Sequence, residues 1–240
     1  ADGRIFATPE LRDWFDTVIP GLSQSGPCHV LDGDLPKRHW FERPLHTPPD
    51  GAVHTVVPGR PIGLHPHTMA ELAAHDIHLH FYGDFTHGQW RAWIDKSLAL
   101  APDHLHLHAN VEPSRWVDEF SRYTAGWLHS FESANQGEIR RANWDDLNYP
   151  ARMATLAAAG LPMIQRRNDG AIVATQTLAR RLEIGVFYDT IDELARTLRE
   201  RQGMAALRAN VLRQRHLFTF DHHVPALINF FREVIGRGAA

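Results

Sequence analysis

Two arginines follow the ends of apolar or turn segments, at positions where a phosphate could be bound. Arg60 comes directly after Gly59 in the segment 58–63 (PGRPIG), and Arg152 lies two residues after Pro150, at the start of an alanine-rich stretch. A guanidinium group can hold a phosphate through two parallel hydrogen bonds, and glycine lets the backbone approach a ligand closely. Arg60 could therefore bind a phosphate, and we predict that Arg152 joins the amino terminus of a helix in holding a diphosphate. The alternatives are a surface ion pair for Arg60 and a solvated position on a well-capped core helix for Arg152.

Histidines form the second group of residues that could carry chemistry, because the chain holds 17 of them. Two sets alternate along predicted strands, so that the members of each set share one face: His78 with His80, and His104 with His106 and His108. Such a spacing could hold zinc or another transition metal, but a metal site needs three or four convergent ligands. These side chains lie on the bodies of strands that we expect to be covered on both faces. We therefore interpret them as packed imidazoles and predict no metal site.

Short apolar runs that end at Gly, Pro or Asp alternate with segments of helical period, which predicts an α/β fold with a Rossmann-like parallel sheet flanked by helices. We predict strands over residues 4–7, 28–31, 52–57, 77–82, 105–109, 125–129, 162–165 and 184–188. Helices are predicted over residues 9–18, 65–75, 87–100, 113–123, 150–159, 174–181, 191–201, 205–215 and 224–235. Ligands of such sheets collect at the carboxyl ends of the strands, beside helix amino termini that attract phosphate. We expect both arginines at that edge.

A stretch rich in proline and glycine, residues 43–51, indicates a joint between two parts of the chain. The part before it is too small to close a sheet, so we predict that residues 1–46 are the end of a domain whose beginning is absent, together with a linker. Residues 47–218 would form a second domain. Residues 219–240 would form a final helix, whose apolar face must dock on another surface.

Composition excludes several classes of protein. The formal net charge is -3, with 25 Lys and Arg against 28 Asp and Glu, so there is no broad basic field and nucleic acid is not an expected partner. No apolar run approaches the roughly 20 residues that span a bilayer. The single cysteine, Cys28, fits a reducing compartment. We expect a cytoplasmic protein, with the inner face of the membrane as the alternative location.

Common catalytic and nucleotide-binding motifs are missing from the sequence. No Gly-x-Gly-x-x-Gly follows a predicted strand, which disfavours a nicotinamide dehydrogenase, and no P-loop pattern is present. A Gly-x-Ser-x-Gly elbow is also missing, which disfavours a serine hydrolase.

The segment that starts at Pro150 resembles a known family. Pro-Ala-Arg-Met at 150–153, followed by Ala-Ala-Gly-Leu-Pro-Met-Ile at 158–164, is similar to the signature "Pro-x-Lys/Arg, then Ala-x-Gly-x-Pro-Val-Ile" of group 1 (family 4-like) glycosyltransferases. That signature belongs to the carboxyl-terminal, donor-binding half of the GT-B fold. The likeness extends to donor-domain strands and loops at residues 53–60, 77–83 and 105–113, and to acceptor-domain units and a returning tail at residues 5–8, 29–34 and from 218 onward.

The resemblance implies a GT-B donor domain, residues 47–218, with a remnant of the acceptor domain in residues 1–46 and a terminal helix that returns to that domain. It implies transfer of a sugar from a nucleotide-diphosphate donor to an unknown acceptor, with retention of configuration and without a metal. The nucleotide-sugar would be a substrate, so no cofactor is implied. The missing amino-terminal domain would be a partner that supplies acceptor-side groups, and the catalytic base therefore stays unknown. The alternative is a non-catalytic sugar-nucleotide-binding or scaffold module of the same fold.

The resemblance also implies individual donor contacts. Arg60 and Arg152 would contact the diphosphate and Asn110 would lie beside the base. The sugar or ribose side would be lined by Ser130, Asn135 and Glu138. The remaining residues of the predicted donor-binding set are Gly59, Gly83, Asn148 and Thr155.

Two positions depart from the family pattern. His65 stands where the family commonly has lysine, and Thr155 stands where it usually has a glutamate that contacts ribose or sugar. We expect Glu138, Asp145 or Asp146 to supply the missing carboxylate, and the departures favour the non-catalytic alternative. His54 and His129 lie near strand ends, where they could be catalytic or bond to a sugar, with a packed structural role as the alternative.

Overall fold

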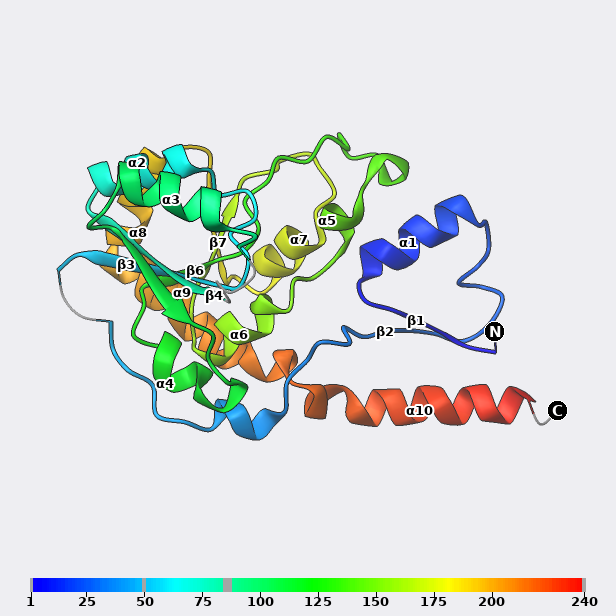
Figure 1. The fold of residues 1–240 in the computed structure, drawn as a ribbon. Helices are drawn as coiled ribbons and strands as arrows, with labels where there is room; N and C mark the ends of the chain where they lie inside the picture. The colour runs from blue at the N-terminus through cyan, green and yellow to red at the C-terminus, as the bar shows by residue number, and fades with distance from the viewer. Residues whose placement is uncertain (1, 49–50, 84–87, 239–240) are drawn as a thin grey trace.

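The computed structural model describes residues 2–48, 51–83 and 88–238 and has a six-stranded parallel sheet at its centre (Figure 1). The strand order is β5-β4-β3-β6-β7-β8. The chain therefore runs outward from β3 to β5, returns to the middle, and continues outward on the other side from β6 to β8. The strands are β3 (Val53–Pro58), β4 (Ile77–Gly83), β5 (Leu105–Ala109), β6 (Ala125–Trp127), β7 (Met163–Arg166) and β8 (Gly185–Tyr188).

Helices cover both faces of the sheet, because the strand side chains alternate between two apolar clusters. Along β4, Ile77, Leu79 and Phe81 are buried toward one cluster, whereas Tyr82 belongs to the other. The first cluster is completed by α2 (Pro66–Ala74), α3 (Arg91–Leu100) and α8 (Ile191–Arg199). The second is completed by α4 (Trp116–Phe120), α6 (Arg152–Ala158), α7 (Ala174–Arg181) and α9 (Arg201–Gln214). The predicted α/β class and the parallel sheet are confirmed.

A small unit precedes the sheet. It contains β1 (Arg4–Phe6), α1 (Pro9–Val18) and β2 (Cys28–Val30), and its two strands pair in parallel. The last helix, α10 (Phe220–Gly238), runs alongside this unit (Figure 1). The ring of Phe230 stacks on that of His29 with 5.6 Å between centroids, and Phe230 is 8% exposed. Phe230 of α10 thus docks on the amino-terminal unit, whereas Ile228, Phe231 and Ile235 are 43%, 48% and 70% exposed. The division of the chain at residues 46 and 218 stays a prediction.

The predicted elements all occur, most of them with boundaries shifted by a few residues. The predicted helix over 113–123 is divided into η2 (Pro113–Arg115) and α4, and the alanine-rich helix starts at Arg152 rather than at Pro150. The predicted start of the 87–100 helix at His87 lies outside the described residues, as do positions 49 and 50 of the proline-rich joint. Four short elements were not predicted: η1 (Arg38–Phe41), η3 (Ile139–Arg141), α5 (Trp144–Leu147) and η4 (Arg215–Phe218).

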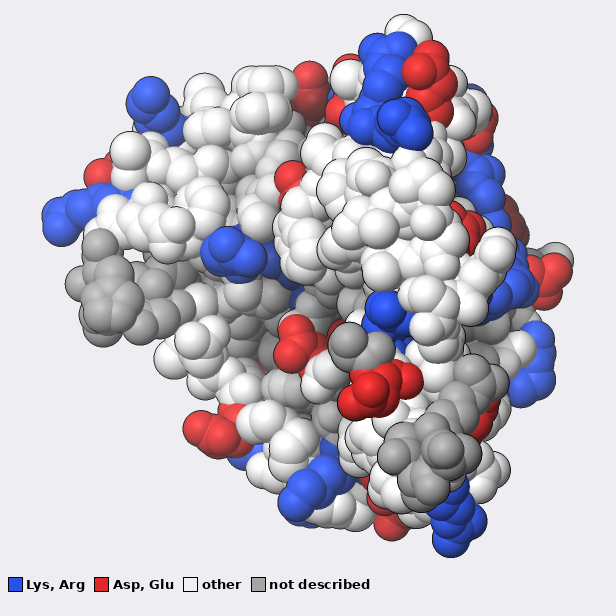
Figure 2. Space-filling model, turned by 90° about the vertical axis from the view of Figure 1, so that its right-hand side faces the viewer, with Lys and Arg blue, Asp and Glu red and all other residues white. Residues whose placement is uncertain are grey.

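Charged side chains of both signs are interspersed over the face that Figure 2 shows, without a continuous basic field. Within the described ranges, no helix is both long enough and apolar enough to cross a bilayer.

Imidazole rings line the side of β3, β4 and β5 that faces Tyr123. Rings of neighbouring strands stack and also form hydrogen bonds with one another. His80 packs at 4.7 Å from Tyr123 between ring centroids. The hydrogen bonds join His54 Nδ1 to His80 Nε2 (2.9 Å), His80 Nδ1 to His108 Nε2 (2.9 Å) and His78 Nδ1 to His106 Nε2 (3.0 Å).

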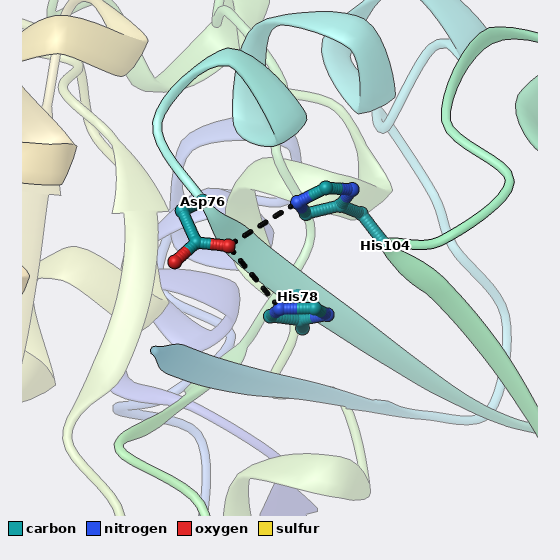
Figure 3. A group of neighbouring side chains, drawn as sticks. All are labelled: Asp76, His78 and His104. Carbon is teal, nitrogen blue, oxygen red and sulfur yellow. Dashed lines mark ion pairs between the residues drawn. The ribbon is translucent and has the colours of Figure 1, made fainter. Parts of the chain in front are cut away.

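The covering of this face is incomplete at the amino ends of the strands. There the side chains of His78 and His104 are 16% and 22% exposed, and that of Asp76 is 68% exposed. The carboxylate of Asp76 lies beside the two rings, with one oxygen near an edge of each (Figure 3). The expectation that both faces are closed therefore fails at this edge, because α4 is only five residues long and packs near the other end.

Candidate functional site

The crevice beside β3 and β6 is the point where the strand order reverses, and a cavity of about 510 Å³ opens there. Open α/β sheets bind ligands at such a reversal, outside the carboxyl ends of the strands. The volume is within the usual range for a small-molecule site. The cavity is lined by Asp34, Pro58, Gly59, Arg60, Ile62, His129, Trp144, Asp145, Asn148, Tyr149, Pro150, Ala151 and Arg152.

Arg152 is a buried cation in this cavity. Arg152 is only 8% exposed, and its Nη2 donates a hydrogen bond to the backbone carbonyl of Arg60. Its Nη1 is buried and has no hydrogen-bond partner among the residues that the structure describes. Burial, followed by the charge of Arg60, lowers the pKa of Arg152 to about 10, so the group stays protonated at neutral pH. A buried guanidinium without a carboxylate partner is costly unless an anion binds it.

The loop after β3 brings its backbone close to this guanidinium. Gly59 has φ +90°, and a Cβ there would lie 3.7 Å from Arg152 Nη2. Gly63 has φ +78°, and a Cβ there would overlap the backbone carbonyl of Ser130. The amide of Ser130 also donates to the carbonyl of Ile62 over 3.1 Å. Glycine at 63 therefore lets the loop after β3 pack directly against the loop after β6.

His129 follows β6 and lies on the floor of the same cavity. Burial, followed by the charges of Arg152 and Arg60, lowers its pKa to about 4, so the ring is neutral at pH 7. Its Nδ1 is 3.9 Å from Oδ1 of Asp145. A neutral imidazole can donate one hydrogen bond and accept another, which suits contact with a hydroxyl group.

The unpredicted helix α5 supplies the opposite wall. Asn143 caps it: the Asn143 side chain accepts from the amides of Asp145 and Asp146, and the Asp146 carboxylate accepts from the Asn143 amide. This capping box turns Trp144 and Asp145 toward the cavity, and Trp144 is 64% exposed. The Asn-x-x-Asp spacing before Leu147 was the signal that could have found this helix.

The structure places four of the predicted donor-binding residues at this cavity: Gly59, Arg60, Asn148 and Arg152. Asp145, one of three carboxylates expected to replace a missing glutamate, also lines it. The other two do not: Asp146 is fully buried in the capping box, and Glu138 is exposed and lies 3.6 Å from Arg141.

The remaining predicted residues lie elsewhere. Gly83 ends β4 and Asn110 follows β5, and neither lines the cavity, because their strands lie beyond β3 on the far side from β6. Thr155 is 6% exposed in the body of α6. Asn135 is fully buried, where its side chain donates to the carbonyl of Ile172 over 2.8 Å and accepts from the amide of Ile172 over 3.0 Å. Its amide is thus used to hold a loop.

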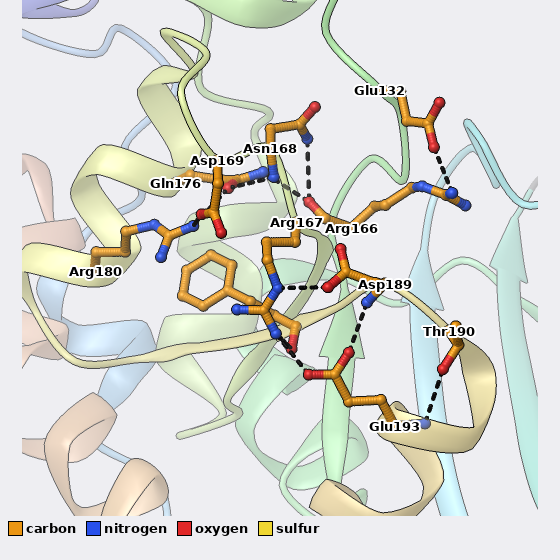
Figure 4. Close-up of polar contacts among 11 residues, drawn as sticks. Glu132, Arg166, Arg167, Asn168, Asp169, Gln176, Arg180, Asp189, Thr190 and Glu193 are labelled. Atoms are coloured by element: carbon orange, nitrogen blue, oxygen red, sulfur yellow. Dashed lines mark hydrogen bonds and ion pairs between the residues drawn. The ribbon is translucent and has the colours of Figure 1, made fainter.

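Ser130 lines a second cavity, of about 420 Å³, and its hydroxyl is 2.6 Å from that of Tyr188. His65, the residue at the family's lysine position, also lines this second cavity and not the first. The guanidinium of Arg166 there is paired with Glu132 (Figure 4). The acidic residues Glu71, Asp189 and Asp192 also line this cavity. The second cavity is therefore a poorer place for a phosphate than the first.

A polar network fixes the loops that follow β7 and β8 (Figure 4). Arg167 donates to Asp189 over 2.8 Å and to Glu193 over 2.6 Å. Asn168 accepts from the amide of Ser133 over 2.6 Å and donates to the carbonyl of Phe131 over 3.0 Å. The segment that was predicted to contact the sugar is therefore held by the loop after β7, and Asn135 is turned inward to bond Ile172 of that loop.

The strand order and the two covered faces define a Rossmann-type α/β sheet, and comparison with known proteins agrees. No family model matches the chain, and no curated protein matches its sequence. Among solved structures, AviGT4, a glycosyltransferase involved in avilamycin A biosynthesis, is similar with a TM-score of 0.56 at 13% identity over 98% of this chain. The structure of accessory secretory protein 1, 2 and 3 in Streptococcus pneumoniae is similar with a TM-score of 0.57 at 11% identity, again over 98% of this chain.

These likenesses establish the fold: a parallel sheet flanked by helices, as in GT-B-like glycosyltransferases. The chain spans 67% of the length of the first of these structures and 44% of the second.

Proposed function

We propose that this chain binds a nucleoside diphosphate sugar in the cavity at the strand reversal and transfers its sugar to an acceptor. The observation that carries the proposal is Arg152, a buried guanidinium with an unpartnered Nη1, beside the exposed Arg60. Two adjacent cations without a carboxylate within 4 Å, among the described residues, suit a diphosphate. The fold likeness to a glycosyltransferase supports the same reading.

The guanidinium groups would act on the leaving group. Cleavage of the bond between sugar and diphosphate leaves negative charge on the phosphate oxygens, and fixed cations in a partly closed cavity stabilise that charge. The family resemblance of residues 150–164 makes the reaction metal-independent and retaining in this proposal. The seven-residue helix α6 adds little, because the amides of Met153 and Ala154 already donate to the carbonyls of Pro150 and Ala151. In this proposal the two guanidinium groups therefore bind the phosphates, and the amides at the start of α6, which the sequence suggested as further donors, do not.

Other cavity groups would contact the sugar or the base. Trp144 offers an exposed aromatic face to a ring, and aromatic stacking suits both sugars and bases. Asp145 and His129 can accept and donate hydrogen bonds to sugar hydroxyls. The acceptor-side groups and the catalytic base would come from outside residues 47–218, as the resemblance implies.

Calorimetric titration of the chain with UDP-, GDP- and ADP-sugars tests this proposal. We expect one panel member to bind at a single site. Arg60→Ala and Arg152→Met should each weaken it about tenfold or more, because each removes a charge-assisted hydrogen bond. Arg232→Ala, which removes an exposed arginine on α10, is the matched control and should bind as the unchanged chain does. Unchanged affinity in both cavity variants would disprove the diphosphate site.

A non-catalytic sugar-nucleotide-binding or scaffold module is the second candidate. It is favoured by Thr155, which stands where the resemblance expects a glutamate and is only 6% exposed. The likeness to an accessory secretory protein, which is not named as an enzyme, is compatible with it. Donor hydrolysis or sugar transfer by a longer chain separates the two: turnover that Arg152→Met abolishes supports the enzyme, and binding without turnover supports the module.

A further inference from the structure

Three potential metal ligands converge at the amino edge of the sheet. Asp76 follows α2, His78 lies near the start of β4, and His104 directly precedes β5 (Figure 3). Their ligand atoms all lie within 4.8 Å of one another. Two segments of the chain, residues 76–78 and the residue before β5, thus bring two imidazole nitrogens and one carboxylate oxygen together at the surface.

The spacing of these atoms fits a tetrahedral ion. Oδ1 of Asp76 is 3.4 Å from Nε2 of His78 and 3.4 Å from Nε2 of His104. Metal–ligand bonds of roughly 2.0–2.2 Å in a tetrahedral zinc site place neighbouring ligands about 3.4 Å apart. Both contacts are within ion-pair distance, no hydrogen bond joins the Asp76 carboxylate to either ring in the described ranges, and the same 3.4 Å is also the spacing of co-ligands on one ion.

Neighbouring imidazoles hold the two rings in place. Nδ1 of His78 is hydrogen-bonded to Nε2 of His106 over 3.0 Å. A proton on His78 Nδ1 leaves a lone pair on its Nε2, and a hydrogen bond of this kind fixes both the tautomer and the orientation of a ligating ring. The His78 ring is stacked between those of His54 and His104, each 4.6 Å away between centroids. The planes of the His78 and His104 rings are only 18° apart, so one ring must turn to direct its Nε2 at a shared ion.

We propose that Asp76, His78 and His104 bind one Zn²⁺ ion, with water completing a tetrahedral site. Two imidazoles and one carboxylate suit zinc, whereas Mg²⁺ and Ca²⁺ prefer oxygen ligands throughout. The ion would join the turn after α2 to the amino ends of β4 and β5, which stabilises that edge of the sheet. This differs from the expectation of packed imidazoles, because the required carboxylate comes from a turn and not from the strands.

The zinc site would be independent of the proposed sugar transfer. β3 and β4 pair in register from Val53 with Ile77 to Pro58 with Tyr82. The cavity lies past the end of β3, so it is separated from the start of β4 by about 17 Å of strand. We therefore expect that the ion does not contact the nucleotide and that its loss leaves nucleotide binding unchanged.

Titration of the chelator-treated full chain with Zn²⁺ tests the site, with Co²⁺ absorption as a probe of tetrahedral geometry. We expect one equivalent of Zn²⁺ to bind, to raise the Tm, and to be unaffected by excess Mg²⁺. Asp76→Asn should weaken binding about tenfold or more, and His104→Gln should remove the Co²⁺ absorption. The control is His39→Gln, which changes an exposed histidine on η1 and should bind as the unchanged chain does.

The variants separate the site from general histidine affinity. Asp76 is 68% exposed, so Asp76→Asn should keep the fold, and the Tm of the metal-free variant checks this. Zinc binding that persists undiminished in both Asp76→Asn and His104→Gln, or no zinc binding by the unchanged chain, would overturn the proposal.

Discussion

At the scale of single residues, the candidate site depends on charges without partners. Arg152 is buried with one backbone hydrogen bond, and Arg60 beside it is exposed. Arg208, which is only partly buried, has more acceptors, since it donates to the carbonyls of His46 and Ser121. A cation kept at a cost to stability is typical of a binding site.

The pKa of His129 should change when a ligand occupies this site. Its pKa is lowered to about 4 by burial and by the charges of Arg152 and Arg60. A bound diphosphate would offset those charges, so we expect the pKa of His129 to rise by about one unit or more on binding. NMR titration of the imidazole resonances with and without nucleotide measures this shift. A His129 pKa that stays at about 4 in the saturated chain would place the phosphate elsewhere.

At the scale of elements, the contact between β6 and α6 sets the position of Arg152. Gly126 of β6 faces Leu156 of α6, and a Cβ at 126 would overlap the Leu156 side chain. Leu156 is fully buried one turn after Arg152 on the same helix. The close approach of strand and helix therefore determines how deep the guanidinium lies.

Gly126→Ala should push α6 away from the sheet. We expect the free energy of unfolding to fall by about 1–3 kcal/mol, as is usual for overpacking of a core. Nucleotide affinity should fall with it, since Arg152 moves with α6. Urea unfolding and calorimetry measure the two effects. Adding Leu156→Ala makes room for the new methyl group. The free energy of unfolding of the double variant should therefore fall by less than the sum of the decreases in the two single variants.

At the scale of the whole molecule, the stacked histidines of β3, β4 and β5, here called the histidine array, make the free energy of unfolding depend on pH. Burial is the main cause of a lowered pKa for His54, His80, His106 and His108, and for His80 the value falls to about 2. The unfolded chain binds these protons near pH 6.5, whereas the folded chain binds them only at lower pH. Stability should therefore be full above about pH 6.5 and decrease as the pH falls below it.

Between pH 7 and pH 5 we expect the free energy of unfolding to fall by at least about 1 kcal/mol, since each such group contributes up to about 1.4 kcal/mol per pH unit. Urea unfolding at both pH values measures the loss. His80→Phe keeps an aromatic ring but cannot be protonated, so its free energy of unfolding should fall less between pH 7 and pH 5. The control variant His39→Gln should show the same fall as the unchanged chain. Equal stability at pH 7 and pH 5 would contradict the role of the array.

The amino-terminal unit is joined to the rest of the molecule partly through α10. Phe230 stacks on His29, and Asp221 at the start of α10 accepts from the amide of Arg38 over 2.8 Å. We expect Phe230→Ala to raise hydrogen exchange in β1 and β2 while leaving exchange in β3 to β8 unchanged. Ile235→Ala, at a position that is 70% exposed, is the control. A uniform rise over the whole sheet would contradict a division of the chain near residues 46 and 218.

The sequence by itself determined the elements and their class. Strand and helix periods are local properties of consecutive side chains, so β3 to β8 and the helices between them could be predicted within a few residues. Arg60 and Arg152 could also be assigned to strand and helix boundaries on one edge. The short helix α5 was missed because its signal is a single capping pattern within four residues.

Only the tertiary structure determined which loops at the strand ends lie side by side. The strand order puts the loop after β3 beside the loop after β6, so Arg60, Arg152 and Asp145 share a cavity, whereas Asn110 lies two strands away from β3. It also turned Asn135 inward, because its side chain bonds Ile172 in the loop after β7. Strand order, burial and carboxylate pairing depend on contacts between residues distant in sequence, and no local pattern encodes them.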